Sequence, residues 1–479
     1  MIKYEVKAPL YFGKVLENPG TVQHKHLDFV YALSTQTESL TPRTNLDYLD
    51  EFRTIWTGLG NKKSGAIGPI KAMIARIQQE SYDLHVAPDA DDSPHALACL
   101  DRCRAVLFPA DSLSLPEFDI PLFGQVLNEL SMDELEFVHG LTTEPAPVHG
   151  RMPVTEVIQW LEEEDPTRTL PLNFLDIPNE TAFQYRPSIF DSHDVLSLIK
   201  DRYGDVEYTP KEWFLVAGGH AVSPFHVDKA GYNTWIRVIK GAKVWHWPRC
   251  AKATARQLIM RSEKDALHHE FPGGCAALTI EPDDVLVMSP GVPHAVYTPL
   301  GRYNSEGELA DSATKNDITT LTTTVVMGGF FWTAASFHES IECLRLQLSG
   351  ELPNNQDISA DDLEDMKLVI DYLGDDQIFA EAHLGDIWNA VTRLLETLDY
   401  TPETTDVDEW ASNYGREFGV TDDDWLGALG MLVTAMKEWA EIWLARSSLV
   451  GEAENNDEDM EEDDDEDDEY QDEDENMEG

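Results

Sequence analysis

Short apolar runs separated by turn residues dominate the middle of the chain, from Leu170 to Trp332. They are rich in Val, Ile, Thr, Phe and Trp, which favour strands, and Gly, Pro and Asp bound them. Many short strands of this kind are typical of a β-sandwich or barrel. A helical pattern over Ser188–Asp201 interrupts the series. The predicted strands are LNFLDI, WFLVAGG, TWIRVIKG, KVWHW, AALTIE, DVLVMS, HAVYT and TLTTTVVMGGFFW.

Helical periodicity prevails on both sides of these strands. In the N-terminal flank, helices are expected over Ile67–Tyr82 and around Ala96–Leu107 and Leu122–Leu141. Further helices are expected over Pro153–Glu164, His338–Leu348, Ser359–Leu373, Asp375–Leu398 and Thr421–Leu449. We therefore predict a mainly helical region over residues 1–150, a barrel over 151–346, a helical domain over 347–450 and a disordered acidic tail over 451–479.

The last predicted helix opens with aspartates after Thr421, which suit a helix N-terminus. An aromatic stripe follows at spacings of three and four residues. Such a stripe is more typical of a core-facing helix, or of a homodimer face, than of a ligand site. The stripe consists of Trp425, Leu429, Leu432, Met436, Trp439 and Trp443.

The formal net charge of −54 makes nucleic acid a poor direct partner, because acidic surfaces repel phosphate. Nineteen acidic residues and no basic one follow Gly451. This tail is too poor in apolar residues to fold. It suits basic proteins such as histones, although a purely solubilising role fits equally well. No apolar run reaches the roughly 18 residues that span a bilayer, and no secretory signal is visible at the N-terminus.

The five cysteines are scattered, which favours a reducing compartment inside the cell. Cys99 and Cys103 lie one helical turn apart, but no second pair is near them. Packed thiols are therefore favoured over a zinc site.

Three His-x-acid pairs occur, about as many as the composition predicts by chance. They are His26/Asp28, His226/Asp228 and His268/Glu270. The second pair differs from the others in its surroundings. Residues two apart on a strand share a face, so His226 and Asp228 can both reach one metal. His294, after a later strand and turn, supplies a third ligand, and two histidines with one carboxylate suit non-haem Fe(II).

Lys243 follows Gly241 and precedes Val244 and Trp245, so its side chain is expected to enter a mostly apolar interior. A buried ammonium group requires an anionic partner, and an acidic cosubstrate such as 2-oxoglutarate could supply it. The alternative is a lysine on a solvated strand face.

Together these residues resemble the JmjC family of Fe(II)/2-oxoglutarate-dependent dioxygenases. The shared pattern runs from His226 and Asp228 through Gly231, Trp235, Gly241, Lys243 and Trp245 to PGVPHAVYTP and VVMGGFF. The resemblance covers about Leu170–Leu346 and is nearest to the histone lysine demethylase branch that often carries PHD or CXXC readers. It implies a double-stranded β-helix, that is, a jelly-roll or cupin-like barrel.

The resemblance also implies roles for single residues. His226, Asp228 and His294 would be the iron ligands, Lys243 would bind the distal carboxylate of 2-oxoglutarate, and Ser223 would add a hydroxyl to the same carboxylate. Ile236 departs from the family pattern, which has Tyr or Asn at that position. This departure affects the substrate class more than the iron site.

The implied function is a histone lysine demethylase that acts by N-methyl hydroxylation. The resemblance places it in the nucleus; otherwise a cytoplasmic protein is expected. Three alternatives remain open: a JmjC hydroxylase of a non-histone protein, a catalytically silent scaffold that binds basic proteins through its tail, and a metal-binding cupin with non-redox chemistry, against which Lys243 counts. Retained ligands and Lys243 argue against a silent scaffold.

Overall fold

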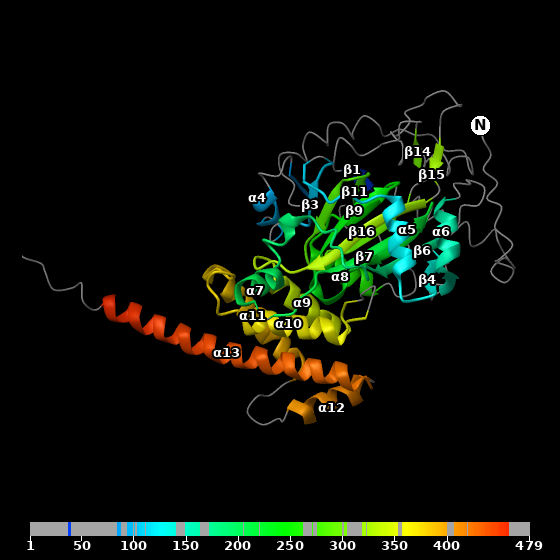
Figure 1. Cartoon of the computed structure of the whole chain (residues 1–479). Coiled ribbons are helices and arrows are strands. Elements are labelled where there is room, and N and C mark those ends of the chain that lie inside the picture. The colour runs from blue at the N-terminus through cyan, green and yellow to red at the C-terminus, as the bar shows by residue number, and fades with distance from the viewer. Residues whose placement is uncertain are drawn as a thin grey trace, which may run out of the picture.

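Two large β-sheets lie at the centre of the molecule, with helices on their outer sides (Figure 1). The structure is a computed structural model. It describes residues 37–39, 84–87, 93–98, 100, 103–110, 112–139, 149–162, 172–204, 206–219, 221–261, 271, 275–298, 301–303, 319–321, 323–352, 357–399, 407–418 and 420–458.

The larger sheet has nine strands, and only its β2–β3 pair is parallel. In spatial order the strands are β2 (Leu84–Val86), β3 (Ala105–Phe108), β12 (Val285–Met288), β9 (Asn233–Lys240), β16 (Thr323–Phe331), β7 (Lys211–Gly218), β6 (Leu172–Pro178), β4 (Glu134–His139) and β5 (His149–Pro153).

The smaller sheet has five strands, which are β1 (Thr37–Ser39), β11 (Cys275–Ile280), β10 (Lys243–Pro248), β13 (His294–Tyr297) and β8 (Val222–His226) in spatial order. A separate pair joins β14 (Gly301–Tyr303) to β15 (Thr319–Leu321). All the strands predicted between Leu170 and Trp332 are confirmed, as β6, β7, β9 to β13 and β16.

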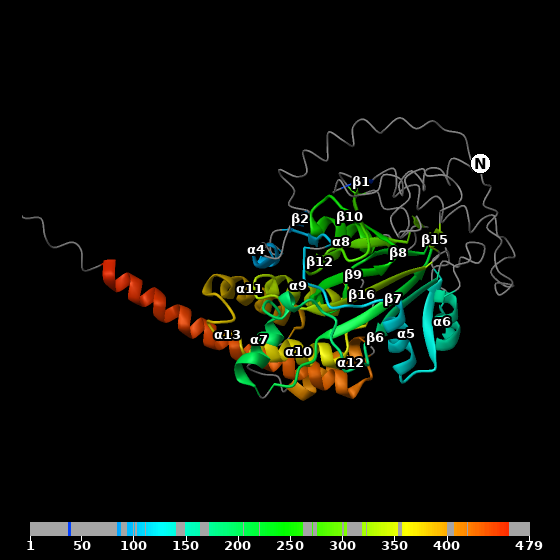
Figure 2. The same cartoon turned by 45° about the horizontal axis from the view of Figure 1, so that its top comes forward.

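The two sheets pack face to face through one apolar cluster. Ile236 and Leu286 of the larger sheet meet Trp245, Trp247 and Leu278 of the smaller one there, and all are buried. Burial of this apolar area is the main force that holds the sheets together. The chain is thus a mixed α/β protein whose sheets are compatible with a β-sandwich or jelly-roll (Figure 2).

Helices cover the outer faces of both sheets. Phe123 of α5 (Ile120–Glu129) and Val157 of α6 (Val154–Glu162) share a buried cluster with Phe174 and Phe214 of the larger sheet. Ala255 of α8 (Lys252–Arg261) packs against the outer face of the smaller sheet. Two further helical segments precede β7: η6 (Ser188–Phe190) and α7 (Val195–Tyr203). They overlap the helical segment predicted over Ser188–Asp201, and α7 continues past its end.

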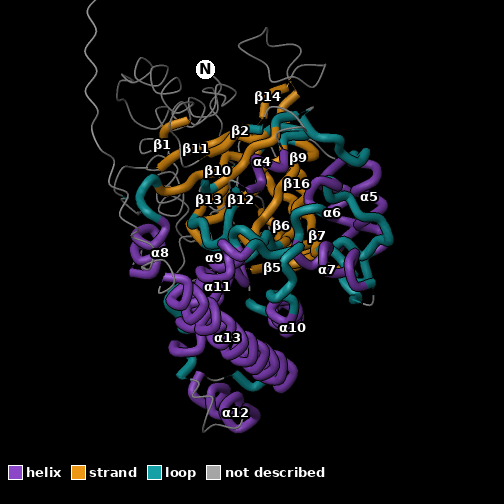
Figure 3. Tube along the Cα trace, turned by 90° about the vertical axis from the view of Figure 1, so that its left-hand side faces the viewer, coloured by secondary structure: helices purple, strands orange, loops and turns teal. Residues whose placement is uncertain are grey.

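The helices after the last strand gather on one side of the sheets (Figure 3). They are α9 (Phe337–Leu348), α10 (Ala360–Asp371), α11 (Glu381–Thr397), α12 (Val407–Phe418) and α13 (Asp423–Glu458). Helices α9, α10, α11 and α13 were predicted, whereas α8 and α12 were not. Ser359 caps α10 through a reciprocal capping box with Asp362, as its sequence indicates.

The aromatic stripe on α13 belongs to the core. Leu429, Leu432 and Met436 are fully buried in the cluster that α13 forms with α9, α10 and α11. The large apolar residues of α13 that are exposed, Met431, Ile442 and Leu444, lie outside that stripe. A homodimer through these helices stays a prediction.

Two helices predicted in the N-terminal flank are wrong in part. The segment around Ala96–Leu107 holds a short helix, α4 (Ser93–Ala98), and then β3, whose four residues are all buried against neighbouring strands. The segment over Leu122–Leu141 changes from α5 to β4 after a turn. In both places a short apolar run forms a strand because it pairs with a neighbouring strand of the sheet. Periodicity alone does not distinguish a strand from a helix in so short a run.

Several predictions concern residues outside the described ranges. The helix over Ile67–Tyr82 and residues 459–479 of the predicted tail are among them. Helix α13 extends to Glu458, past the tail boundary that we predicted at residue 451. The four-part domain division stays a prediction. Among the described helices, none is long and apolar enough to cross a membrane.

Candidate metal centre

His226 and His294 meet across two neighbouring antiparallel strands of the smaller sheet. His226 is the last residue of β8, His294 is the first of β13, and the two are direct cross-strand partners. A bulge follows, because Ser223 opposes Val296: three residue steps on β8 match two on β13. The extra residue lets both Ser223 and His226 turn toward the space between the sheets, which regular alternation would forbid.

Asp228, just after β8, completes a compact group of three metal-binding side chains. One donor atom from each of the three residues lies within 4.8 Å of the others. The Asp228 Oδ1 atom is 3.9 Å from His226 Nε2 and 3.8 Å from His294 Nε2. Two imidazoles and one carboxylate form the donor set of non-haem Fe(II) sites and leave coordination positions open. The residues present therefore fit such a metal.

The local hydrogen bonds orient these ligands. His294 Nδ1 lies 2.9 Å from the carbonyl oxygen of Val292, so this nitrogen donates and Nε2 keeps its lone pair for a metal. Thr234 Oγ1 donates to Asp228 Oδ2 at 2.6 Å, which leaves Oδ1 toward the histidines. Such hydrogen bonds from neighbouring groups set the geometry of metal ligands.

A tight turn follows Asp228 and packs against α9. Ala230 and Gly231 both adopt left-handed backbone angles, with φ of 50° and 62°. A Cβ atom on Gly231 would clash with the backbone of Ser340 in α9. Glycine is therefore required at this position by its conformation and by the close approach of the helix.

We expect Gly231→Ala to destabilise the protein by more than about 2 kcal/mol, because a left-handed L-residue costs about 1–2 kcal/mol before the clash is counted. Gly350→Ala is the matched control, since Gly350 has φ of 70° but no other group lies within 4 Å of the position that its Cβ would take. Urea unfolding of both proteins measures the difference. Equal losses would show that Ser340 does not crowd Gly231.

Lys243, the first residue of β10, is 1% exposed and lies between the sheets. Its neighbours identify the face: Trp245 on the same side belongs to the core between the sheets, whereas Val244 packs outward with α8. The ammonium group donates to Thr298 Oγ1 at 2.7 Å. Among the described residues, it forms no ion pair with a carboxylate.

Burial lowers the pKa of the Lys243 ammonium group to about 7. A cation without a charged partner in an apolar interior is costly, and an incoming carboxylate would relieve that cost. Thr298 bonds Lys243, and the half-buried Ser223 lies on the adjoining strand β8, opposite Val296 of β13. This is the donor chemistry that an acidic cosubstrate needs.

Other residues singled out from the sequence fall into three groups. Ile236, which departs from the family pattern, is buried in the core between the sheets, and its side chain therefore faces the interior. Trp247 and Trp332 are fully buried packing residues. Cys103 is buried, which agrees with a packing role, and Cys99 lies outside the described residues.

Sequence reasoning missed the residues that hold the ligands in place. Thr234 bonds the Asp228 carboxylate, Thr298 bonds Lys243, and Gln347 donates to the backbone carbonyl oxygen of Asp228. Gln347 lies 119 residues from Asp228 along the chain, so no local spacing could have indicated it. Thr298 carried one weak signal, its place at the end of the HAVYTP motif.

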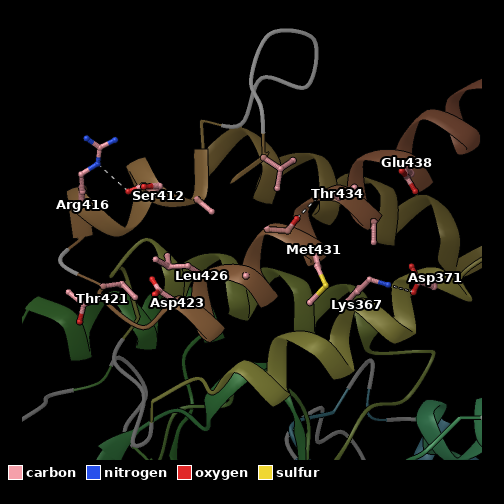
Figure 4. Close-up of a pocket in the computed structure, with 16 residues that line it drawn as sticks. Lys367, Asp371, Ser412, Arg416, Thr421, Asp423, Leu426, Met431, Thr434 and Glu438 are labelled. Carbon is pink, nitrogen blue, oxygen red and sulfur yellow. Dashed lines mark hydrogen bonds and ion pairs between the residues drawn. The ribbon is translucent and has the colours of Figure 1, made fainter. Parts of the chain in front are cut away.

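A separate groove of about 760 Å³ lies among α10, α12 and α13 (Figure 4). Lys367 and Asp371 form an ion pair at one part of its wall, and Met431 and Leu426 contribute apolar surface. None of the metal-site residues lines it. The groove is therefore distinct from the metal centre.

Comparison with known proteins supports a relation to the JmjC family. The chain is 30% identical over 93 residues to the JmjC domain-containing histone demethylation protein 1 of Caenorhabditis briggsae. The match covers 19% of this chain and 9% of that protein. No family model matches the chain. The similarity supports the family relation and does not distinguish its branches.

Proposed function

We propose that the protein is an Fe(II)- and 2-oxoglutarate-dependent protein oxygenase. The observation that carries this proposal is the convergence of His226, Asp228 and His294 on one point, with donor atoms within 4.8 Å of one another. The buried Lys243 in the same inter-sheet space supports it independently, because a structural metal site has no use for such a cation.

Each residue has a defined task in this proposal. His226 and His294 would bind iron through Nε2, and Asp228 would bind it through the carboxylate that Thr234 orients. Lys243 would pair with the distal carboxylate of 2-oxoglutarate, with Thr298 and Ser223 as hydroxyl partners. Iron and 2-oxoglutarate together supply oxidation of a C–H bond by O₂, coupled to the release of succinate and CO₂. The apolar wall around Lys243 excludes water from the cosubstrate.

We further propose a histone lysine demethylase as the specific activity. Hydroxylation of an N-methyl group yields a product that releases formaldehyde and leaves the amine. The similarity to a protein named for histone demethylation supports this assignment. A nuclear location and basic protein partners for the acidic C-terminal segment, such as histone tails, belong to the same proposal.

Hydroxylation of a non-histone protein is the second candidate, and Ile236 is the observation that favours it. This side chain is 1% exposed and points into the inter-sheet core, where the resembling family carries Tyr or Asn. An apolar group there removes a hydrogen-bonding contact, so the substrate of this chain can differ from that of its relatives.

The test is incubation of the purified chain with Fe(II), 2-oxoglutarate and methylated histone peptides. Succinate formation reports the oxygenase activity itself. Mass spectrometry of the peptides then separates the candidates: loss of one CH₂ per methyl group means demethylation, gain of one oxygen atom means stable hydroxylation of the histone, and neither mass change points to a non-histone substrate. Iron-loaded protein that forms no succinate above the level of a His226→Ala variant would contradict the proposal.

A further inference from the structure

Gln347, on the last turn of α9, forms hydrogen bonds to the main chain of Asp228 and Ala230 through both the nitrogen and the oxygen of its side-chain amide. Its Nε2 donates to the Asp228 carbonyl oxygen at 2.9 Å, and its Oε1 accepts from the Ala230 backbone N–H at 2.8 Å. A single side chain thus satisfies two backbone groups of the same turn. Such paired hydrogen bonds fix orientation as well as distance.

The turn needs support of this kind. Ala230 has φ of 50°, and a left-handed conformation costs an alanine about 1–2 kcal/mol. Strained backbone persists only where the surrounding contacts hold it. The bond from the Ala230 N–H to Gln347 is one such contact, and the close packing of Gly231 on Ser340 is another.

Lys229, between Asp228 and Ala230, anchors the same turn to a second helix, α10, through an ion pair. Its Nζ lies 2.9 Å from Asp362 Oδ2, at the start of α10. Lys211 and Tyr232 bond the other oxygen of the same carboxylate. Burial raises the pKa of Asp362, but the two lysines outweigh it and hold this pKa well below its usual range. The turn after Asp228 is therefore anchored to two helices that lie outside the sheets.

Helix α9 also reaches the turn that carries the opposite ligand. Arg256 of α8 donates to the Gly291 carbonyl oxygen at 2.9 Å and lies 3.3 Å from the Cys343 sulfur of α9. Lys252 bonds both Ser289 and Glu339, the latter on α9. Ser289 and Gly291 shortly precede His294. One helix therefore contacts, directly or through α8, both segments that present metal ligands.

We propose that Gln347 is a positioning residue for the Asp228 carboxylate and sets the affinity of the metal centre from the C-terminal helices. The inference rests on the metal centre of the proposed function. Gln347 touches neither metal nor cosubstrate in this role. Gln347 fixes the main chain of Asp228 and Thr234 fixes its side chain. Together they hold the Asp228 Oδ1 atom close to the Nε2 atoms of both His226 and His294.

Titration of the metal-free chain, residues 1–479, with Mn(II) or Co(II) tests the proposal without any turnover. Gln347→Met, which keeps the length but not the polar groups, is expected to weaken metal binding by about 10-fold or more, as supporting residues of metal ligands do. Gln347→Glu retains an acceptor for Ala230 but cannot donate to Asp228 when ionised. It is expected to weaken binding as well while preserving the fold. The visible absorption of bound Co(II) is expected to change in both variants.

Arg345→Met is the matched control, because Arg345 lies on the same helix and pairs with Glu342 and not with the turn. It is expected to bind metal as the wild type does. A Gln347→Glu protein that is folded and has wild-type metal affinity and Co(II) spectrum would overturn the inference and leave the proposed function intact. Absence of metal binding in the wild type would overturn both.

Discussion

Asp228→Ala is expected to abolish metal binding and to reduce succinate formation to the background level. Asp228 supplies the only carboxylate of the three-residue group that the described part of the chain brings together. Its loss leaves two imidazoles with no anionic ligand, and the attraction to a divalent cation falls accordingly. We expect affinity to decrease by more than about 100-fold, beyond the effect of supporting residues. Isothermal titration with Fe(II) or Mn(II) and a succinate assay measure the two effects.

His226→Ala is expected to behave in the same way, because it removes a ligand from the same point. His383→Ala is the control: His383 is a half-buried histidine of α11 and does not belong to the three-residue group. Its protein is expected to retain metal and activity. Retention of one tightly bound metal per chain by Asp228→Ala would show that the three residues are not the centre.

Much of the sheet architecture was predictable because its strands are short, β-branched and bounded by turn residues. The segment from Thr323 to Phe331 is buried at every position, so its long apolar run has one plausible place, the middle of a sheet. In the N-terminal flank the same reasoning failed. The AVLF run of β3 is too short for periodicity to separate strand from helix, and its pairing partner β12 lies far along the chain.

Of the candidate site, the three metal-binding residues could be predicted from the sequence, but the residues that support them could not. The two histidines and Asp228 could be found because local spacing and a later motif mark them, and the structure places them together. Their supports could not be found. Gln347 acts from a helix more than a hundred residues away, and the bulge that turns Ser223 inward depends on the register between two strands. A single sequence carries no signal for either.

Lys243→Met is expected to lose 2-oxoglutarate binding while the unliganded protein becomes no less stable at neutral pH. Truncation of one partner of a buried charge pair costs about 2–5 kcal/mol, which corresponds to about 30-fold or more in affinity. In the unliganded protein the same ammonium group is buried without a carboxylate among the described residues, so an apolar side chain of similar length removes a desolvation cost. Calorimetric binding and thermal unfolding measure the two effects. Lys240→Met is the control, because Lys240 ends β9, the strand that precedes Lys243 along the chain. This variant is expected to bind 2-oxoglutarate as the wild type does.

The pH dependence gives the same prediction a second readout. Burial lowers the pKa of Lys243 to about 7 from 10.5, so between these values the unfolded chain binds more protons than the folded one. The stability of the unliganded wild type should therefore gain a contribution as pH rises through this window, and Lys243→Met should lack it. Because 2-oxoglutarate pairs with the charged form, its dissociation constant should increase above about pH 7. Unchanged binding in Lys243→Met, or a wild-type dissociation constant that falls with pH, would contradict the assigned role of this lysine.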